Sequence, residues 1–542
     1  MKRQRWCNRP GMSPVLHKLF ADAGMVSKRF APRPRGQTRH RELAPGLPGI
    51  QLVGQPDKAI QESRERVRSA LRNSGFRGPL VRVVINLAPA DRRKEGPAFD
   101  LPIALGLLVA SGQLDRPKLD GLWCAGELGL DGSLRPCRGV IALADLAMQQ
   151  GARALVVPPA NATEAALIPN LNIWTAHNLK ELVQQLKGEC PFVRIGHHPS
   201  PQQATPAAIP LELVGLGMEG MERATHALAL AAAGGHHLLM VGPPGCGKTH
   251  LARQLPLLLP PLNTAESLTI SRIHSVAGEF DICEQLLHQR PFRSPHHSCS
   301  GVALLGGGHT PKPGEISLAH SGVLFLDELA EFPRPVLDLL RQPLEDGKVR
   351  LSRMRETTVF PAAVTLVAAT NPCPCGWHGD HEQACRCTCS QRQRYWQRLS
   401  GPLLDRIDLQ LRLERRSSRQ IRTCLDASQR PKTHSPWLEP SRVNAARQRM
   451  QARNPSGCNN RSLTAADLHR HGQFKADGLT LWERVIEQRR LTTRSSLQLL
   501  RVARTIADLN GHDMVQTEAI ADASGYRCTD LMGDHSAGAV SR

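Results

Sequence analysis

Eight consecutive residues near the middle of the chain have the spacing of a phosphate-binding loop. Gly242 to Thr249 read GPPGCGKT, which fits the pattern G-x-x-x-x-G-K-T, after an apolar run and before a helical pattern. Glycines let successive backbone N–H groups point at phosphates, and the start of a helix adds the positive end of its dipole. We therefore predict that ATP or GTP binds to Gly242, Pro243, Pro244, Gly245, Cys246, Gly247, Lys248 and Thr249, with Lys248 at the β- and γ-phosphates and Thr249 at Mg²⁺.

Two acidic residues and an asparagine follow two further apolar runs. Asp327 and Glu328 close GVLFLDE, and Asn371 comes directly after VTLVAAT. An Asp at the end of such a strand completes the Mg²⁺ shell through water, and the adjacent Glu polarises the attacking water. Asn371 is expected to hold the same water and to sense the γ-phosphate. A Glu after the Asp is more typical of motor ATPases than of GTPase switches, so ATP is the predicted nucleotide.

Two arginines later in the chain are candidates for a role in hydrolysis. Arg406 stands in LSGPLLDRIDLQLRL, before another apolar run, and we predict that it reaches a neighbouring subunit's γ-phosphate as an arginine finger. Arg494 begins a late helix and is expected to fold back onto the same nucleotide. A lone arginine is usually a solvated surface residue, so both predictions depend on the ordered set of motifs that precedes them.

Five of the 15 cysteines crowd between Cys373 and Cys389. The order is C-x-C followed by C-x-C-x-C, with His378 and His381 between the two groups. Converging thiolates of this number can make a tetrahedral Zn²⁺ site, for which Cys373, Cys375, Cys385 and Cys387 are the predicted ligands. A reduced cysteine-rich loop without metal is the alternative. A zinc ion here would be structural, because the ATP chemistry is complete without it.

The elements that must position these residues fall into several units. Strand and helix patterns alternate around the phosphate-binding loop, which predicts a parallel sheet covered by helices. An α+β unit precedes it and helical spacing follows it. An Asp131-Gly132 turn indicates a hairpin in the first unit. The predicted boundaries are a basic segment 1–43, disordered or atypical; an N-terminal domain 44–190; a linker 191–210; an ATPase core 211–415 with a Cys-rich insert 373–389; and a helical lid 416–542.

Composition limits the partners and the compartment. The 542 residues carry a net charge of +21, which favours a polyanionic partner such as nucleic acid, although a generally basic surface is the alternative. Scattered cysteines without a secretory signal favour a reducing cytoplasm. No apolar run approaches the roughly 18 residues of a membrane helix, so no membrane partner is expected.

The ordered motifs are the signature of AAA+ ATPases, and the sequence closely resembles the YifB/ComM family of magnesium-chelatase-like members. The resemblance rests on these segments: GLPGIQLVGQPD, ESRERVRSAL, FDLPIALGLL, AAAGGHHLLMVGPPGCGKT, RPFRSPHHS, GEISLAHSGVLFLDE, NPCPCG, SGPLLDRIDL and VARTIADLNG. It implies an α/β AAA+ core with a helical C-terminal lid, after an α+β Lon-protease-like (ribosomal S5 domain 2-like) domain. The family begins with a strand-rich segment that residues 1–43 do not resemble.

The resemblance also implies roles for residues outside the nucleotide site. The chelatase and replicative-helicase branch has a hairpin that points into the ring's channel, and KVRLSRMRETTVFPA is similar to it. Arg350, Arg353 and Arg355 are therefore predicted to follow DNA phosphates, with solvated hairpin residues as the alternative. Ala98 and Ala142 stand where an active Lon domain carries its Ser nucleophile and Lys base, so no protease activity is expected.

The family includes a hexameric helicase that drives branch migration during natural transformation. We accordingly predict a hexameric, DNA-translocating ATPase that uses ATP and Mg²⁺ on single-stranded or branched DNA. Two alternatives stay open: a chelatase-type motor that remodels a partner protein for metal insertion, and a protein-remodelling ATPase whose Lon-like domain binds clients.

Overall fold

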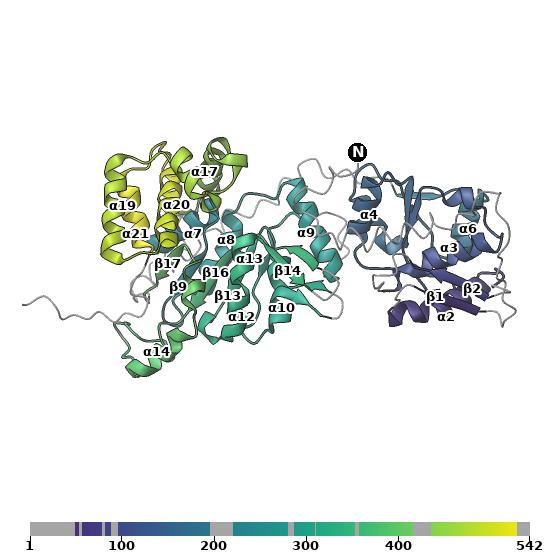
Figure 1. Ribbon diagram of the computed structural model, residues 1–542, viewed down its shortest axis with the longest axis horizontal. Helices are drawn as coiled ribbons and strands as arrows, with labels where there is room; N and C mark the ends of the chain where they lie inside the picture. Colours follow the sequence, from purple (N-terminus) through teal and green to yellow (C-terminus); the bar gives the residue numbers. More distant parts are fainter. Residues whose placement is uncertain are drawn as a thin grey trace, which may run out of the picture.

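A computed structural model describes residues 49–53, 57–78, 82–87, 96–195, 221–279, 287–308, 311–352, 357–415 and 435–527. The predicted basic segment 1–43, most of the predicted linker 191–210, and the arginines Arg353 and Arg355 lie outside these residues. An N-terminal α/β part, a central sheet with its helices and a C-terminal helical part follow one another along the molecule (Figure 1). None of the described helices is long and apolar enough to cross a membrane.

The N-terminal part contains two sets of paired strands and the helices that cover them. β1 (Gly49–Val53) pairs in parallel with β2 (Arg82–Asn86), and the predicted turn joins β4 (Glu127–Leu128) to an antiparallel β5 (Leu134–Arg135). The four-stranded sheet has the order β3 (Leu122–Cys124), β6 (Ala154–Val157), β7 (Ile173–Thr175) and β8 (Val193–Ile195). The helices are α2 (Lys58–Asn73), α3 (Asp100–Ala110), α4 (Val140–Gln149), α5 (Ala162–Ala166) and α6 (Leu179–Lys187).

One boundary of the sequence prediction is wrong in this part. Val193–Ile195 fall inside the predicted linker 191–210, but they form β8, which runs antiparallel to β7. The preceding Phe192 stacks on Trp174 with 3.8 Å between ring centroids. The partly buried Phe192 packs on the buried Trp174 and so holds the segment on the sheet, and the N-terminal part extends to at least Ile195.

The central sheet is parallel, as predicted, and has five strands. Their order is β10 (Phe292–Arg293), β13 (Val323–Leu326), β16 (Thr365–Thr370), β9 (Leu238–Val241) and β17 (Leu409–Arg412). Alternate residues enter two different cores: Leu238 and Met240 face one side of the sheet, while Leu239 and Val241 face the other. Because both faces are covered, these strands are continuous apolar runs rather than alternating ones.

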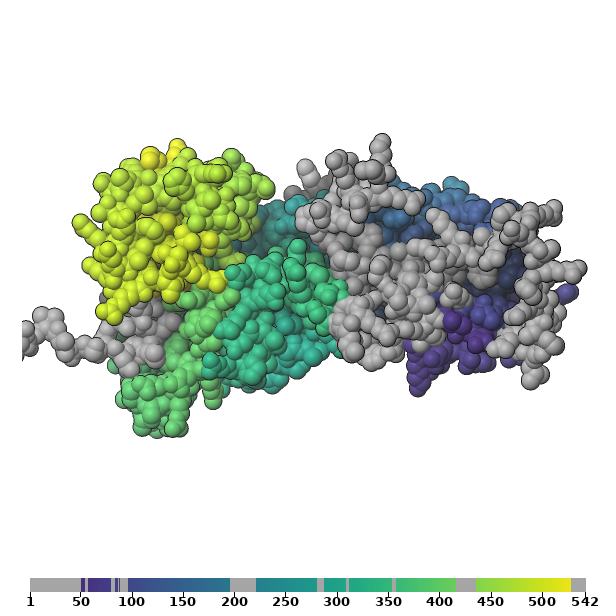
Figure 2. Space-filling view, viewed as in Figure 1, coloured from purple at the N-terminus to yellow at the C-terminus, as the bar shows by residue number. Residues whose placement is uncertain are grey.

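Helices cover both faces of this sheet, and a separate hairpin lies beside it. The helices are α7 (Glu222–Gly234), α8 (Lys248–Leu258), α9 (Thr264–Ala277), α10 (Gly301–Leu305), α11 (Glu315–Leu318), α12 (Arg334–Leu339), α13 (Arg341–Asp346), α14 (Cys389–Gln397) and α15 (Gly401–Leu404). The hairpin consists of β14 (Lys348–Ser352) and β15 (Thr357–Pro361). The segment with α14 stands out from the body of the molecule (Figures 1 and 2).

The C-terminal part is helical, as predicted, and shares its core with one face of the sheet. Its helices are α17 (Pro440–Arg453), α18 (Ala465–His471), α19 (Ala476–Arg489), α20 (Thr493–Leu509) and α21 (Thr517–Gly525). A buried ion-pair network fixes α17 to α20: Asp508 accepts from Arg453 at 2.6 Å and from the fully buried Arg504 at 3.0 Å. Asn460 adds a hydrogen bond to Asp508 at 2.7 Å.

Candidate functional site

The predicted phosphate-binding residues form one loop between β9 and the start of α8. Gly245 and Gly247 have φ values of 75° and 94°, in the left-handed region that favours glycine. A Cβ atom at Gly242 would lie 2.8 Å from the Leu413 carbonyl oxygen, so only glycine fits where the loop leaves the strand. The helix that follows directs its N-terminal backbone N–H groups toward the loop, as phosphate binding requires.

Lys248 joins the phosphate-binding loop to the end of β16. Its ammonium group donates to the carbonyl oxygens of Gly242 at 2.7 Å and Pro243 at 2.9 Å, and to Asn371 Oδ1 at 3.1 Å. Burial lowers the pKa of the Lys248 ammonium. The lysine and the asparagine, which lie 123 positions apart in the sequence, therefore share one site.

Thr249 and Asp327 provide oxygen ligands of the kind that Mg²⁺ prefers. Thr249 Oγ1 donates to Asp327 Oδ2 at 3.0 Å, and Asp327 directly follows β13. A hydroxyl and a carboxylate next to a phosphate-binding loop match the usual protein share of a magnesium–nucleotide site. Both residues would hold the ion, whose chemistry is to neutralise charge on the β- and γ-phosphates.

Glu328 has a partner that the sequence analysis missed. Its carboxylate lies 3.1 Å from Nδ1 of His297, and its backbone adopts φ 52°, ψ 46° in the left-handed region. His297 lies in the segment RPFRSPHHS, four residues after the end of β10, and β10 pairs in parallel with β13. Residues after neighbouring parallel strands meet at one edge of the sheet, so this pairing would have indicated the contact had β10 been recognised.

Arg406 and Arg494 lie at the opposite edge of the sheet from the phosphate-binding loop. Arg406 precedes β17, and β17 runs parallel to β9, so Arg406 is near the strands' amino ends. Both arginines bind one carboxylate: Arg406 donates to Glu345 Oε2 at 2.8 Å, and Arg494 to Oε1 at 3.1 Å. Partial burial opposes ionisation, yet the two guanidinium groups hold the pKa of Glu345 below its ordinary value.

The expectation that Arg494 folds back onto its own nucleotide does not match this arrangement. Helix α20 packs its N-terminal turn against the segment before β17, where Ser495 and Gln498 hydrogen-bond to Asp405. These contacts place Arg494 beside Arg406, away from the edge that carries Lys248 and Asn371. The difference arises because the place of Arg494 depends on how α20 packs against the central sheet, and local sequence patterns do not specify that packing.

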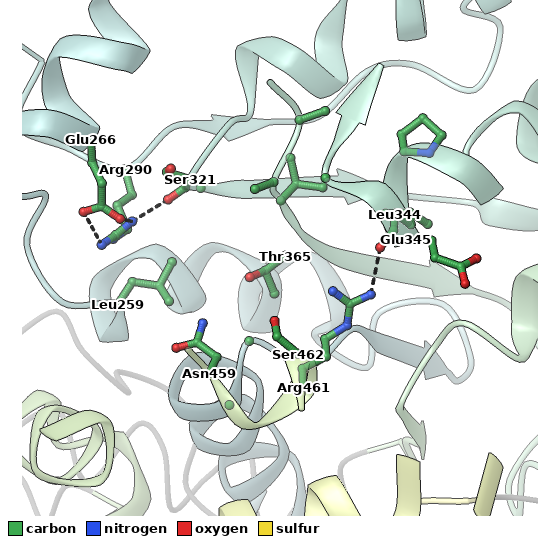
Figure 3. A pocket seen from close by; sticks show the side chains of 18 of the residues that line it. Leu259, Glu266, Arg290, Ser321, Leu344, Glu345, Thr365, Asn459, Arg461 and Ser462 are labelled. Atoms are coloured by element: carbon green, nitrogen blue, oxygen red, sulfur yellow. Dashed lines mark hydrogen bonds and ion pairs between the residues drawn. The ribbon is translucent and has the colours of Figure 1, made fainter. Parts of the chain in front are cut away.

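A polar pocket of about 360 Å³ also opens at the amino-end edge, between the sheet and the C-terminal helices (Figure 3). Arg290 in this pocket bonds to Glu266 and to the Ser321 carbonyl oxygen, and Arg461 bonds to the Leu344 carbonyl oxygen. Glu345 lines the same pocket. The edge of the sheet that carries Arg406 and Arg494 therefore has both positively and negatively charged side chains at its surface.

The hairpin predicted to carry DNA-binding arginines is present as β14 and β15. Arg350 is exposed on β14, while Val349 beside it is buried. Arg353 and Arg355 come between these two strands in the sequence and lie outside the described residues.

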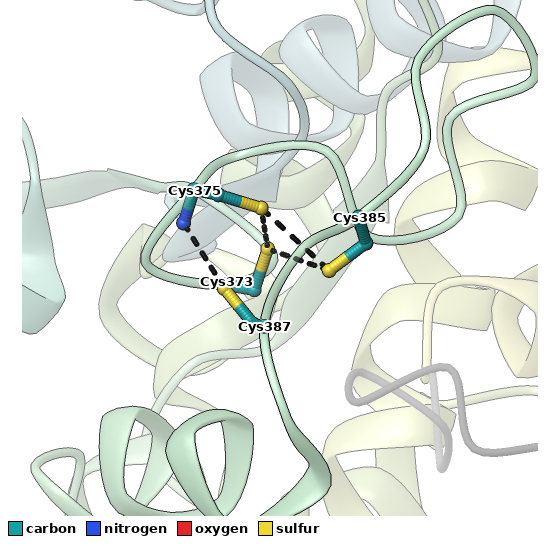
Figure 4. A group of neighbouring side chains, drawn as sticks. All are labelled: Cys373, Cys375, Cys385 and Cys387. Carbon is teal, nitrogen blue, oxygen red and sulfur yellow. Dashed lines mark hydrogen bonds between the residues drawn. The ribbon is translucent and has the colours of Figure 1, made fainter.

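The four cysteines predicted as metal ligands lie together (Figure 4). Their Sγ atoms are all within 4.8 Å of one another.

In the N-terminal part, Ala98 is half-buried against the core of the four-stranded sheet, and Ala142 on α4 is 3% exposed. Neither alanine side chain can serve as the nucleophile or the base of a protease.

Comparisons with known proteins agree with these motifs. Models of the magnesium chelatase family match three stretches: "Subunit ChlI of Mg-chelatase" residues 40–161, "Magnesium chelatase, subunit ChlI" residues 216–421, and "Magnesium chelatase, subunit ChlI C-terminal" residues 440–527. This family implies ATPase activity.

Two curated proteins are similar over most of their length, and a third is similar over a short part. YifB of Escherichia coli strain K12 is 41% identical over 91% of this chain and 94% of its own. Competence protein ComM of Haemophilus influenzae is 41% identical over 90% of this chain and 93% of its own. Lon protease 2 of Bacillus subtilis is 31% identical over 24% of this chain and 25% of its own. The extent of the first two matches shows that the chain belongs to the YifB/ComM family of magnesium-chelatase-like ATPases.

Proposed function

We propose that this protein hydrolyses ATP in a ring, hexameric by family resemblance, with each nucleotide held between two subunits. The supporting observation is the division of the predicted catalytic groups between two edges of one sheet. Lys248, Glu328 and Asn371 follow strands at one edge, whereas Arg406 and Arg494 share Glu345 at the other. A four-residue strand such as β9 spans roughly 13 Å, so these arginines serve a neighbour's nucleotide rather than their own.

In this proposal the residues at the loop perform distinct steps. The loop and Lys248 bind the phosphates, Thr249 and Asp327 hold Mg²⁺, and Glu328 accepts a proton from the attacking water. Asn371, held by Lys248 at 3.1 Å, orients that water and responds to the γ-phosphate. Arg406 and Arg494 of the adjacent subunit neutralise charge that develops in the transition state.

We further propose that the ring moves along DNA, as a branch-migration helicase or translocase in recombination or natural transformation. The support is a net charge of +21, the exposed Arg350 on the β14–β15 hairpin, and a relative named as a competence protein. Only 4% of the residues are aromatic, which favours a grip on the phosphate backbone over base stacking.

The test is ATP turnover with and without single-stranded, duplex and branched DNA, at several salt concentrations. DNA should stimulate turnover, and the stimulation should weaken with salt because bound phosphates release counterions. The measurement is repeated on a chain that begins at Leu43, because the basic residues 1–43 could bind DNA non-specifically. If that chain neither binds DNA at low salt nor responds to it, the DNA proposal fails.

A chelatase-type motor that remodels a partner protein is the second candidate. The match of residues 216–421 to the magnesium chelatase ATPase subunit favours it. A third account, a protein-remodelling ATPase, would use the N-terminal part to bind clients. Stimulation of turnover by a protein fraction, with no effect of any DNA, would support these alternatives.

The domain assignment is part of the proposal. We propose an N-terminal domain 44–190, extended through β8, an ATPase core 211–415 with its Cys-rich insert 373–389, and a lid 416–542, all in line with the family matches. We infer a Lon-like fold without protease chemistry for the first domain. The similarity to Lon protease 2 is consistent with that fold, and Ala98 and Ala142 remove the dyad.

A further inference from the structure

Four thiols converge beside the proposed nucleotide site but take no part in its chemistry. We propose that Cys373, Cys375, Cys385 and Cys387 bind one structural Zn²⁺ ion, and that this zinc knot fixes Asn371 and the phosphate-binding loop. The ion itself is independent of the proposed ATPase function, whereas its effect on turnover rests on that function.

The sulfur positions fit a single tetrahedral ion. Cys373 Sγ lies 3.3 Å from Cys375 Sγ and 3.6 Å from Cys385 Sγ, and Cys375 and Cys385 are also 3.6 Å apart. Four thiolates at about 2.3 Å from zinc would stand about 3.8 Å from one another. The two Cys-x-Cys pairs come from opposite arms of one loop (Figure 4), so an ion would close the loop as a crosslink.

The surroundings suit a closed thiolate site. Cys373 is fully buried, and the other three thiols are half-buried. The Cys375 backbone N–H points at Cys387 Sγ across 3.4 Å, and Arg392 donates to the Cys387 carbonyl oxygen at 3.1 Å. The N–H contact stabilises one thiolate directly, and the guanidinium places a positive charge next to the Cys387 backbone. Four soft ligands with no open position select a structural zinc ion rather than a catalytic one.

The same loop touches two parts of the nucleotide site. Cys373 comes two residues after Asn371, and Trp396 on α14 donates to the Pro372 carbonyl oxygen between them at 3.0 Å. Gly376 has φ +85°, and a Cβ atom there would lie 2.7 Å from Pro244 of the phosphate-binding loop. A shift of the knot would therefore move both Asn371 and Pro244.

Metal content of the purified full chain tests the ion. We expect about one zinc per chain in the wild type and in Cys389→Ser, a matched control on an exposed cysteine next to the site, and none in Cys385→Ser/Cys387→Ser. Cobalt substitution should give thiolate-to-cobalt absorption in the wild type, which decides the question even if the double variant fails to fold. The proposed zinc site would be wrong if the purified wild type contained no zinc or contained iron instead. It would also be wrong if the double variant kept a full complement of zinc.

Reversible zinc removal tests the coupling. With Mg²⁺ in excess, we expect zinc-free protein to hydrolyse ATP at least about tenfold more slowly while ATP binding changes much less, and added Zn²⁺ to restore the rate. Zinc-free protein with an unchanged circular dichroism spectrum and an unchanged rate would overturn the coupling. If the zinc-loaded wild type bound zinc but hydrolysed no ATP, the proposed function would fail and the zinc site would stand.

Discussion

Glu328 combines an exposed carboxylate with a strained backbone and a histidine partner. Its φ of 52° turns the side chain out of the line of β13, and His297 lies 3.1 Å from one carboxylate oxygen. Left-handed backbone at a residue without a glycine's freedom costs about 1 kcal/mol or more, and such strain concentrates at functional sites. The geometry leaves the other oxygen available to a water molecule.

The roles of Lys248 and Glu328 can be separated by substitution. Lys248→Ala should abolish ATP binding, because it removes the cation at the phosphates. Glu328→Gln should bind ATP normally yet lower kcat by about 10²- to 10⁴-fold, since only the proton acceptor is lost. Equilibrium binding of a fluorescent ATP analogue and steady-state turnover check both effects. Normal turnover in Glu328→Gln would contradict the assigned role.

His297 is predicted to position Glu328 without touching the nucleotide. His297→Ala should lower kcat by about tenfold, less than Glu328→Gln does, because the carboxylate stays but loses its orientation. ATP affinity should not change. His297→Asn, which retains a donor, should recover part of the rate. His296→Ala is the control for loss of the neighbouring ring, because His296 hydrogen-bonds to Ser298 and packs on His297 with 4.0 Å between ring centroids, whereas the contact with Glu328 belongs to His297. An equal loss of rate in both alanine variants would point to a disturbed loop.

At the scale of elements, the order of strands explains why part of the site is predictable from sequence. The phosphate-binding loop, Asp327 and Asn371 each follow an apolar run, and parallel strands bring their carboxyl ends to one edge. β10 has only two residues and gave no such signal, so His297 was missed. The pairing of Arg406 and Arg494 with Glu345 depends on how α20 packs, which no local pattern specifies.

The segment of the β14–β15 hairpin is predicted to contact DNA phosphates. Replacing Arg353 and Arg355 with Ala should weaken DNA binding about equally for all sequences and flatten the log–log salt dependence by roughly one unit per lost contact. Turnover without DNA should survive. Arg484→Ala, on the exposed face of α19, is the matched control. DNA titrations at several salt concentrations measure the slope of log affinity against log salt concentration. An unchanged slope in the double variant would show that these arginines do not contact DNA phosphates.

At the scale of the whole molecule, the N-terminal part is fastened to the core by α9. Arg272 on α9 pairs with Asp145 on α4 at 2.8 Å, and Ser275 donates to Glu164 at 2.5 Å. Leu268 packs against the core around α4. Both charges of the ion pair are largely buried, so breaking it would leave an uncompensated charge and would be costly. These contacts therefore bind α9 of the central part to α4 and α5 of the N-terminal part.

A ring with shared sites makes a prediction about mixed subunits. Lys248→Ala inactivates the phosphate-binding edge of a subunit's sheet, and Arg406→Ala removes the arginine at the opposite edge, which serves the neighbouring subunit. Each variant alone should be inactive, but a random equimolar ring would contain intact sites at about a quarter of its interfaces. Turnover should therefore reappear on mixing. Lys248→Ala mixed with Glu328→Gln should stay inactive, because both changes damage the same edge.

The same experiment decides on which nucleotide Arg494 acts. If Arg494 serves the neighbour's nucleotide, as its bond to Glu345 beside Arg406 indicates, mixing Arg494→Ala with Lys248→Ala should also restore turnover. If it serves its own nucleotide, every intact phosphate-binding edge in the mixture would lack Arg494, and activity would not return. Light scattering on the mixtures confirms that rings have formed, so that a failure to recover turnover counts against the shared site and not against assembly.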